Sequence, residues 1–332
     1  MKLSVLDQAP ISREDNPVET LQNTLKLAQI TEKLGYQRYW VAEHHNTSGL
    51  ASTSPEILMT RIASVTEKIR VGSGGVLLPQ YSPYKIAENF KTMEALFPDR
   101  IDLGIGRSPG GAEITRQALL DGQTKSLSEF PRQVRDLQGF LHNSLERDHP
   151  FRLVKAGPRI EAAPPLWILG LSERGARNAA EMGAGFVFGH FINPKNGKKA
   201  LEAYHQAFQP SPSLPQPRTI VCIFIICAET EEEAEELAIS QDKWLLNVGK
   251  GRDTKVPSIE EVKEKGFTED ERKEISNNRK RCIVGTPAKV KQELERLRDN
   301  YQTDEFMVIT NIYDFHAKVR SYELIKEAVL DG

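Results

Sequence analysis

Residues that can move protons lie in two short clusters. In the run Glu43-His44-His45, a carboxylate and two imidazoles could exchange protons or bond the polar edge of a ring at neutral pH. Neighbouring residues of a strand point to opposite faces, so at most one of the two histidines is expected to face a pocket easily. A structural role for the pair is equally open. His190 supplies a third imidazole, just after a predicted strand.

Glycine-rich stretches mark positions where a ligand could approach the backbone. Gly74 and Gly75 fall within an apolar strand, which they weaken unless a planar ligand lies over it; a β-bulge explains them equally well. The run GIGRSPGG, from Gly104 to Gly111, adds one fixed cation, Arg107, and suits an anion or an electron-rich ring. It lacks the third glycine of a dinucleotide-binding loop, so it is weak evidence for a nucleotide site of that kind.

A third cluster lies where a predicted helix begins. The run GLSERGAR contains Ser172, Arg174 and Arg177 beside backbone N–H groups that a first helical turn leaves unbonded. Such a helix start is suited to a phosphate. An ordinary serine N-cap explains the same residues and is the better explanation of this run taken alone.

Composition excludes several classes of protein. The chain has 44 Lys and Arg against 46 Asp and Glu, a formal net charge of -2, whereas nucleic-acid binders normally carry a strong basic excess. Its three cysteines show no metal-ligand spacing, and their odd number is typical of a reducing compartment. No apolar run is long enough to span a membrane, and the N-terminus lacks the apolar stretch of a signal peptide. We therefore expect a cytoplasmic globular protein without a metal site.

The elements that must position these clusters alternate between short apolar runs and longer amphipathic stretches. The predicted strands cover residues 3–6, 39–42, 69–78, 101–105, 166–169, 185–188, 220–227 and 305–309. The predicted helices cover residues 20–34, 55–66, 83–96, 111–145, 173–182, 194–208, 231–247, 286–298 and 315–330. Eight strands in this alternation can close a parallel (β/α)8 barrel of the TIM type, an α/β fold whose active sites lie at the C-terminal ends of the strands. An open doubly wound sheet has the same local pattern, and periodicity does not choose between the two.

A segment of dense mixed charge, residues 249–281, breaks this alternation. We expect it to be an insertion near the barrel mouth, within a single domain that covers residues 1–332. A solvated helical excursion is one interpretation. A mobile lid is the other, because long insertions in barrels often serve as active-site loops.

The order of the motifs carries a resemblance that covers nearly the whole chain. The matching stretches are AEHH at residues 42–45, the run from residue 73 to residue 111, ILGLSERGARNAAEMGAGFVFGHF, and VGTPAKVKQELERL. Residues 78–111 are the most diagnostic of them. Together these stretches resemble the bacterial-luciferase-like flavin monooxygenases, and look closest to the single-chain bacterial members without an assigned substrate.

The resemblance implies a (β/α)8 barrel that binds reduced FMN at its mouth. Gly74 and Gly75 would lie beside a non-proline cis peptide beneath the isoalloxazine ring. His44 matches the family's histidine near the reactive face of the flavin, and Glu43 would orient the imidazole ring of His44. His190 would line the substrate side of the site.

The phosphate of the cofactor has a second implied site. Arg107 and the helix start that contains Ser172, Arg174, Ala176 and Arg177 would hold it. The family often carries smaller or hydroxyl-bearing residues where this chain has Glu173-Arg174. Whether Arg174 or Arg177 faces the anion therefore stays open.

The implied activity is that of a monooxygenase acting on paired donors with incorporation of molecular oxygen. Reduced FMN, supplied by a separate NAD(P)H:flavin reductase or reduced in place, would act with dioxygen on a small organic substrate that the sequence does not identify. Related proteins leave two alternatives: hydride transfer with a deazaflavin or a flavin, and flavin binding without turnover. A phosphosugar enzyme on the same fold is a further possibility. The resemblance also implies a homodimer.

Overall fold

A closed ring of eight parallel strands forms the centre of the computed structural model, which describes residues 1–108, 110–252 and 254–331. In ring order the strands are β1 (Lys2–Asp7), β2 (Arg38–Val41), β3 (Arg70–Ser73), β5 (Ile101–Gly106), β6 (Leu166–Gly170), β7 (Gly185–Gly189), β8 (Thr219–Cys227) and β10 (Glu305–Ile309). Strand β10 pairs with both β8 and β1, which closes the ring. The TIM-type (β/α)8 barrel predicted from the sequence is therefore confirmed.

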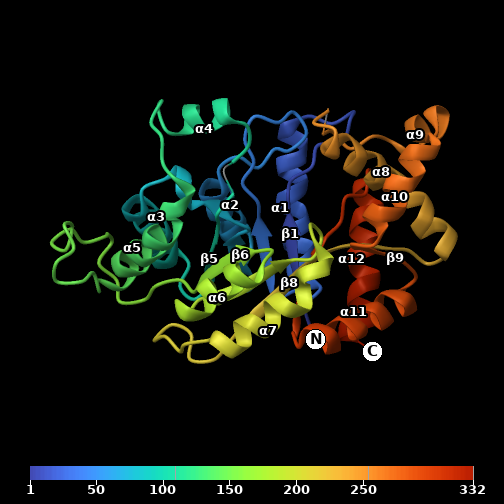
Figure 1. The fold of residues 1–332 in the computed structure, drawn as a ribbon. Coiled ribbons are helices and arrows are strands. Elements are labelled where there is room, and N and C mark those ends of the chain that lie inside the picture. Colours follow the sequence, from blue (N-terminus) through green and yellow to red (C-terminus); the bar gives the residue numbers. More distant parts are fainter. Residues whose placement is uncertain (109, 253, 332) are drawn as a thin grey trace.

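Helices surround the barrel and connect its strands (Figure 1). They are α1 (Pro17–Lys33), α2 (Pro55–Val65), α3 (Pro83–Leu96), α5 (Phe130–His142), α6 (Glu173–Glu181), α7 (Gly197–Ala207), α8 (Glu231–Gly249), α11 (Pro287–Tyr301) and α12 (Phe315–Leu330). Helices α2 and α3 begin at the predicted residues, and α1 begins three residues before its predicted start. Each of these helices, like α11, has proline in the first turn, where its missing N–H costs no helical bond. Among the described residues, none of the helices combines the length and the apolar composition that a membrane crossing requires.

Two tryptophans fill the middle of the barrel. The rings of Trp40 on β2 and Trp167 on β6 meet edge to face, with centroids 5.8 Å apart. Glycines make room for them: a Cβ at Gly72 would lie 2.3 Å from the Trp40 ring, and one at Gly185 would lie 2.3 Å from the Trp167 ring. A larger residue at either glycine would displace an indole. Each tryptophan ring therefore packs against a glycine, which has no side chain to compete for the space.

Buried charges close the barrel at the N-terminal ends of its strands. The guanidinium of Arg38 lies 2.6 Å from Asp102 and 2.8 Å from Glu305, and Arg70 bonds the other oxygen of Asp102. The hydroxyl of Ser4 donates to Glu305 over 2.6 Å. Burial alone would raise the pKa of Asp102, but Arg38 and Arg70 outweigh it and lower that pKa. The two guanidinium groups therefore hold Asp102 ionised.

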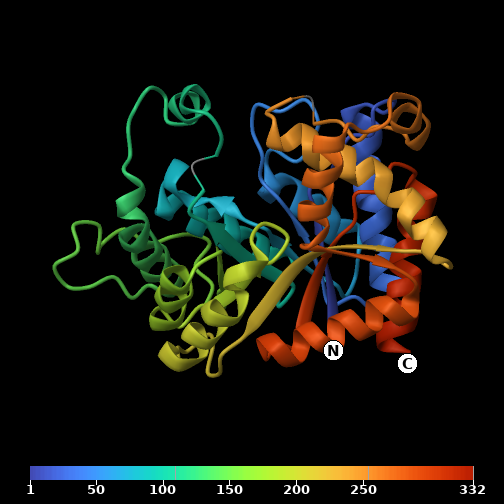
Figure 2. The same ribbon diagram turned by 45° about the vertical axis from the view of Figure 1, so that its right-hand side comes forward.

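Two predicted elements are divided in the structure. The expected strand over residues 69–78 is interrupted at Gly74 and resumes as β4 (Val76–Leu77), which leads into the short helix η1 (Leu78–Gln80). The expected helix over residues 111–145 consists of α4 (Glu113–Leu119), η2 (Leu127–Glu129) and α5, because Gly122, with φ of 75°, lies in a turn between them. The segment that carries α4 rises above the mouth of the barrel (Figures 1 and 2).

The charged segment over residues 249–281 is a helical excursion on the opposite side of the mouth (Figure 2). It contains α9 (Ile259–Lys265) and α10 (Glu269–Arg279), and α10 buries none of its residues. Backbone bonds tie the segment to the loop after β1, since Val256 donates to Ile11 and accepts from Arg13. A strand that the sequence analysis missed, β9 (Cys282–Gly285), follows and pairs with β8 outside the ring.

Candidate active site

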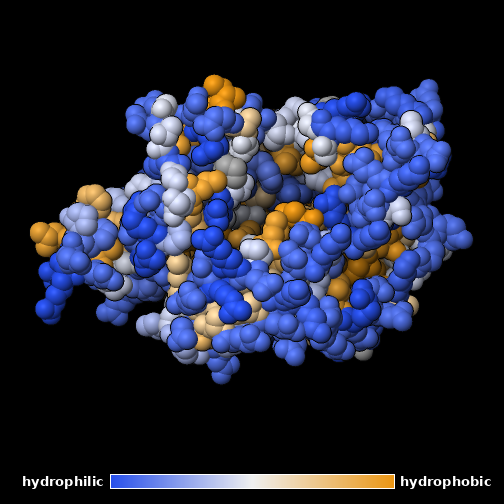
Figure 3. Space-filling view, viewed as in Figure 1, coloured by the Kyte–Doolittle hydropathy of each residue, from blue (hydrophilic) through white to orange (hydrophobic). Residues whose placement is uncertain are grey.

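A cavity of about 580 Å³ opens at the mouth, where the C-terminal ends of the barrel strands meet. Figure 3 shows a hollow between the α4 side and the α8–α10 side, with apolar side chains in its depth and hydrophilic ones around it. The apolar lining includes Leu6, Trp40, Leu77, Val187, Phe191 and Met307. A cavity of this size and character is typical of a small-molecule or cofactor site, and this end of a barrel is where active sites lie.

One wall of the cavity is bare backbone. The peptide between Gly74 and Gly75 is cis, as the family resemblance implies for this position, and both residues line the cavity. A Cβ at Gly75 would lie 2.9 Å from the carbonyl oxygen of Gly104, and one at Gly74 would lie 2.4 Å from Leu6. Only glycine fits at this approach between β3 and β5, and the result is a flat surface open to a planar ligand.

The ends of β5 and β6 supply positive charge. Arg107 and Arg174 both line the cavity and are exposed, and neither has an ion-pair partner among the described residues. Helix α6 begins beside them, and its first-turn N–H groups point out of the helix. The hydroxyl of Ser172 caps the helix by accepting from the N–H of Gly175 over 3.2 Å, as an ordinary N-cap does. Two free cations and a helix N-terminus make this side suitable for an anionic group.

Glu43 holds one edge of the cavity together. Its Oε1 lies 2.7 Å from His45 Nε2 and accepts the hydroxyl of Tyr81, while its Oε2 accepts the N–H of Leu77 over 2.8 Å. The expectation that Glu43 orients His44 is therefore wrong for this structure, since its partner is His45. Burial, followed by the hydrogen bond to Glu43, raises the pKa of Tyr81 well above its usual range. The carboxylate thus fixes a phenol, an imidazole and the β4 backbone in place.

Both neighbouring histidines reach the cavity, contrary to the expectation for adjacent strand residues. Strand β2 ends at Val41, so His44 and His45 lie beyond the alternation of the strand. The Nδ1 atom of His44 is buried without a hydrogen-bond partner in the described chain. Burial, and then the charge of His45, lowers the pKa of His44 to about 4. At neutral pH, His44 is an uncharged imidazole that lines the cavity and has one unbonded nitrogen.

Three predicted site residues lie elsewhere. Ala176 packs in the core around the barrel, because it faces inward from α6, while Arg177 is exposed on a face of α6 that does not line the cavity. His190 also lies outside the cavity lining: its Nδ1 is 2.9 Å from the hydroxyl of Tyr301, and the imidazole is buried. The turn after β7 brings Gly189 and Phe191 to the cavity and directs His190 between them toward α11.

The structure adds residues that the sequence analysis missed. Gln8 follows β1 directly, so a polar residue at the end of the first strand was the available signal. Cys222 on β8 and Met307 on β10 form part of the cavity floor. They lie within apolar runs, and nothing in those runs separates a cavity residue from a core residue.

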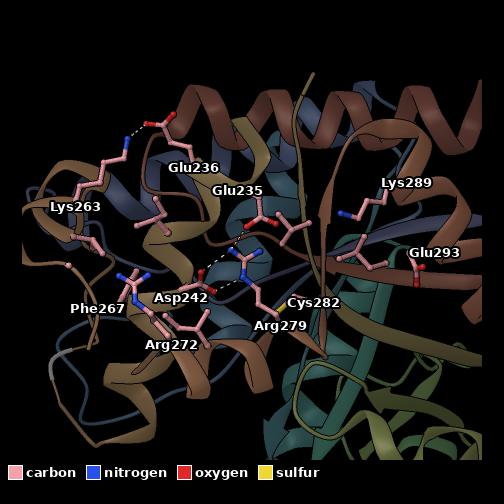
Figure 4. Close-up of a pocket in the computed structure, with 16 residues that line it drawn as sticks. Glu235, Glu236, Asp242, Lys263, Phe267, Arg272, Arg279, Cys282, Lys289 and Glu293 are labelled. Atoms are coloured by element: carbon pink, nitrogen blue, oxygen red, sulfur yellow. Dashed lines mark hydrogen bonds and ion pairs between the residues drawn. The ribbon is translucent and has the colours of Figure 1, made fainter. Parts of the chain in front are cut away.

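A second hollow, of about 900 Å³, lies between α8, α9, α10 and β9 (Figure 4). Its ionic groups are largely paired with each other: Arg279 bonds Asp242 through two nitrogens at 2.7 and 2.8 Å and also reaches Glu235, and Lys263 bonds Glu236. It contains none of the predicted site residues. The charged groups of the larger hollow therefore largely bond one another, whereas those of the smaller cavity at the mouth include two arginines without an ion-pair partner among the described residues.

The mouth cavity fits a flat ring system with an anionic tail. The bare backbone at Gly74–Gly75 accommodates the ring, and Arg107, Arg174 and the start of α6 accommodate the anion. These features agree with each other because they line one continuous cavity. FMN is a ligand of this shape and charge.

Comparison with known proteins gives matches along the whole chain. The family model described as luciferase-like monooxygenase matches residues 1–303. Among relatives, protein YceB of Bacillus subtilis (strain 168) is 57% identical over 99% of each chain, and N-acetyl-S-alkylcysteine monooxygenase of the same organism is 35% identical over 99% of this chain and 98% of its own. The crystal structure of apo-MsnO8 superposes with a TM-score of 0.91 at 38% identity, covering 98% of both chains.

More distant structures share the fold with different cofactors. The oxygenating constituent of 3,6-diketocamphane monooxygenase from Pseudomonas putida, solved in complex with FMN, has a TM-score of 0.72 at 21% identity over 99% of this chain and 97% of its own. An F420-dependent secondary alcohol dehydrogenase has a TM-score of 0.69 at 16% identity over 99% of this chain and 98% of its own. The match to the family model over residues 1–303 and the relatives above 30% identity show that the chain belongs to the luciferase-like monooxygenase family.

Proposed function

We propose that the protein is an FMN-dependent monooxygenase that uses reduced FMN and dioxygen to oxygenate a small organic substrate. The observation that carries this proposal is the mouth cavity, in which a glycine surface at Gly74–Gly75 lies in one space with the unpaired cations Arg107 and Arg174. When bound, the flavin supplies the activation of dioxygen, and the protein supplies binding, orientation and exclusion of water.

The residues of this chain divide that work between them. Arg107, Arg174 and the start of α6 bind the phosphate, and Gly74–Gly75 supports the ring. His44, neutral at pH 7 and with an unbonded Nδ1, is able to accept or donate a proton inside the cavity. Glu43 keeps the adjacent His45 and Tyr81 in position. The apolar walls keep water from the reacting groups.

We propose a thioether as the substrate class. A relative that matches nearly the full chain is named N-acetyl-S-alkylcysteine monooxygenase. The cavity floor combines apolar side chains with the sulfur atoms of Cys222 and Met307, a polarizable surface that suits an alkyl sulfide. An N-acetylated S-alkylcysteine is therefore the first substrate to test.

Oxygen uptake tests the proposal. Purified protein, FMN, a flavin reductase and NADH should consume dioxygen above the free-flavin background only when the thioether is present, and the sulfide should gain oxygen. Replacing the imidazole, His44→Gln, should lower kcat roughly 100-fold or more and leave FMN affinity unchanged. If FMN binds tightly but neither the thioether nor other small sulfides raise oxygen uptake above background, the protein binds flavin without turnover.

Hydride transfer with a deazaflavin is the second candidate. A structure of the same fold is an F420-dependent alcohol dehydrogenase, and the same cavity could accept its ring. The absorbance spectrum of the chromophore bound during expression in a deazaflavin-producing host separates the two. A deazaflavin spectrum and oxygen-independent oxidation of an alcohol would favour this candidate.

We also propose a separate NAD(P)H:flavin reductase as a partner and a homodimer as the assembly. The Gly104–Gly111 loop lacks the glycine register of a dinucleotide site, so FMN reduction elsewhere is the simpler arrangement. Large apolar side chains are exposed on two helices that pack together, Ile57 on α2 at 73% and Leu96 on α3 at 59%. Sedimentation equilibrium of the wild type and of Ile57→Glu would test the dimer, which the charge should weaken.

A further inference from the structure

The loop after β1 holds Gln8 at the cavity in a fixed position. Asp7 on one side is buried and accepts from Tyr39, Thr24 and the backbone N–H of Ala9. On the other side, Ala9 bonds Ala51 through its carbonyl over 2.9 Å and has φ of 49°. The backbone at Gln8 is therefore anchored from both neighbours, and its side chain follows Leu6 into the barrel interior.

The side-chain amide of Gln8 has no hydrogen-bond partner within the described residues. Gln8 is only 7% exposed, lines the cavity, and has a buried Oε1 without a donor. Buried polar atoms in native proteins are nearly always bonded, and an unbonded one needs an explanation. An apolar residue would fill the same space without that penalty, so a ligand that bonds the amide is the direct explanation.

Gln8 lies across the barrel from the anion-binding side. In the ring of eight strands, β1 stands opposite β6, which carries Arg174 at its end. Strand β10, which pairs with β1, contributes Met307 to the same wall, and β8, the next strand beyond β10, contributes Cys222. This wall is apolar and contains sulfur atoms, and Gln8 adds a free amide to it.

We propose that Gln8 is a specificity-determining residue that recognises an amide on the substrate beside its apolar, thioether-bearing part. A secondary amide offers an N–H to Gln8 Oε1 and a carbonyl to its Nε2, so it satisfies the side chain in either orientation of the glutamine amide. The substrate class is thus an alkyl sulfide that carries an acylated amine. This inference rests on the oxygenase function proposed above and names the group on the substrate that the site selects.

Binding of a matched substrate pair tests the inference. One ligand is an alkyl thioether with an acetamide group; the other is the acetate ester, in which oxygen replaces the N–H. Anaerobic calorimetry on the FMN-loaded protein should show that the wild type binds the acetamide roughly 10- to 100-fold more tightly than the ester. Gln8→Leu should bind both alike, and Gln8→Met, which keeps the length of the side chain, should do the same. Met307→Leu changes the same wall without removing an amide, so it should keep the preference.

Other outcomes overturn the inference. Equal affinity of the wild type for both ligands, affinity for neither, or a preference that survives in both Gln8 variants would remove the assigned role. A parallel FMN titration guards against a different role: if the Gln8 variants lose FMN affinity by the same factor, the amide serves the cofactor and the inference is wrong. Oxygen uptake by the wild type with other sulfides would then show separately whether the proposed oxygenase function stands.

Discussion

At the N-terminal end of the barrel, the buried charges of Arg38, Asp102 and Glu305 bond one another, whereas at the mouth the buried polar atoms of Gln8 and His44 have no partner in the described chain. Arg38, Asp102, Glu305 and Gln8 are buried, and His44 is partly buried beyond the end of β2. The difference is that the first set completes its own hydrogen bonds and the second faces a cavity. Groups of the first kind stabilise the fold, and groups of the second kind are available to a ligand.

Removing a charge from the N-terminal end should have the largest effect on stability. Asp102→Ala leaves Arg38 buried with one partner fewer and should lower the free energy of unfolding by about 3–5 kcal/mol. Urea unfolding measures this. Glu293→Ala, which breaks an exposed ion pair with Arg296, is the control and should cost about 0.5 kcal/mol or less. Equal costs for the two variants would mean that the buried network contributes no more than a surface pair.

Removing a charge from the mouth should affect binding instead. Arg107→Ala and Arg174→Ala should each weaken FMN binding roughly 10-fold, because each removes a hydrogen bond to a charged group, and should leave the unfolding free energy unchanged. Fluorescence titration with FMN and with riboflavin measures this, since riboflavin has no phosphate and should respond little. Arg177→Ala, on the same helix but outside the cavity, is the control. A loss of FMN affinity in Arg177→Ala alone would place the phosphate on the other face of α6.

The glycines beside the cavity affect both the stability of the fold and the shape of the binding site. Gly104→Ala would place a Cβ 2.0 Å from the carbonyl oxygen of Ser73, so it should cost about 1–3 kcal/mol of stability and disturb the wall at Gly74–Gly75. Gly106→Ala, two residues further along β5, meets nothing closer than 3.9 Å and should be stable. Thermal unfolding of the two variants checks this, and a Gly104→Ala variant as stable as wild type would show that the strands separate easily.

Acid should destabilise the folded protein through His44 and His190. The pKa values of His44 and His190 are lowered from 6.5 to about 4. Between pH 6.5 and pH 4, both histidines are therefore protonated in the unfolded chain and neutral in the folded protein. Stability should therefore fall as the pH drops below about 6.5, with the loss complete near pH 4. His44→Gln and His190→Gln should each reduce this pH dependence in urea unfolding. A slope that neither variant changes would assign the acid loss to other groups.

The sequence predicted the barrel because each strand is an apolar run between amphipathic helices. The structure has strands and helices in the same alternation. It missed β9, whose four residues follow directly on a charged helix and pair only with the free half of β8. It also treated residues 111–145 as one helix, since the periodicity on both sides of Gly122 is helical. These errors occur where tertiary pairing or a single turn decides the structure.

The candidate site was predictable where a residue type at a strand end carries its own chemistry. Glu43, His44, Gly74, Gly75, Arg107, Ser172 and Arg174 all line the mouth cavity. Two of the predicted residues do not line the cavity because of the direction of their side chains. His190 points to Tyr301, and Arg177 lies on another face of α6. Gln8 could have been singled out as a polar residue directly after the first strand, but its lack of a hydrogen-bond partner is visible only in the folded structure.

A crystal structure of the protein with FMN would decide whether the mouth cavity is the flavin site. We expect the isoalloxazine ring to lie against the Gly74–Gly75 peptide and the phosphate to lie beside Arg107, Arg174 and the start of α6. Density for FMN in the hollow between α8 and α10, or a ring in the mouth with its phosphate far from both arginines, would contradict it.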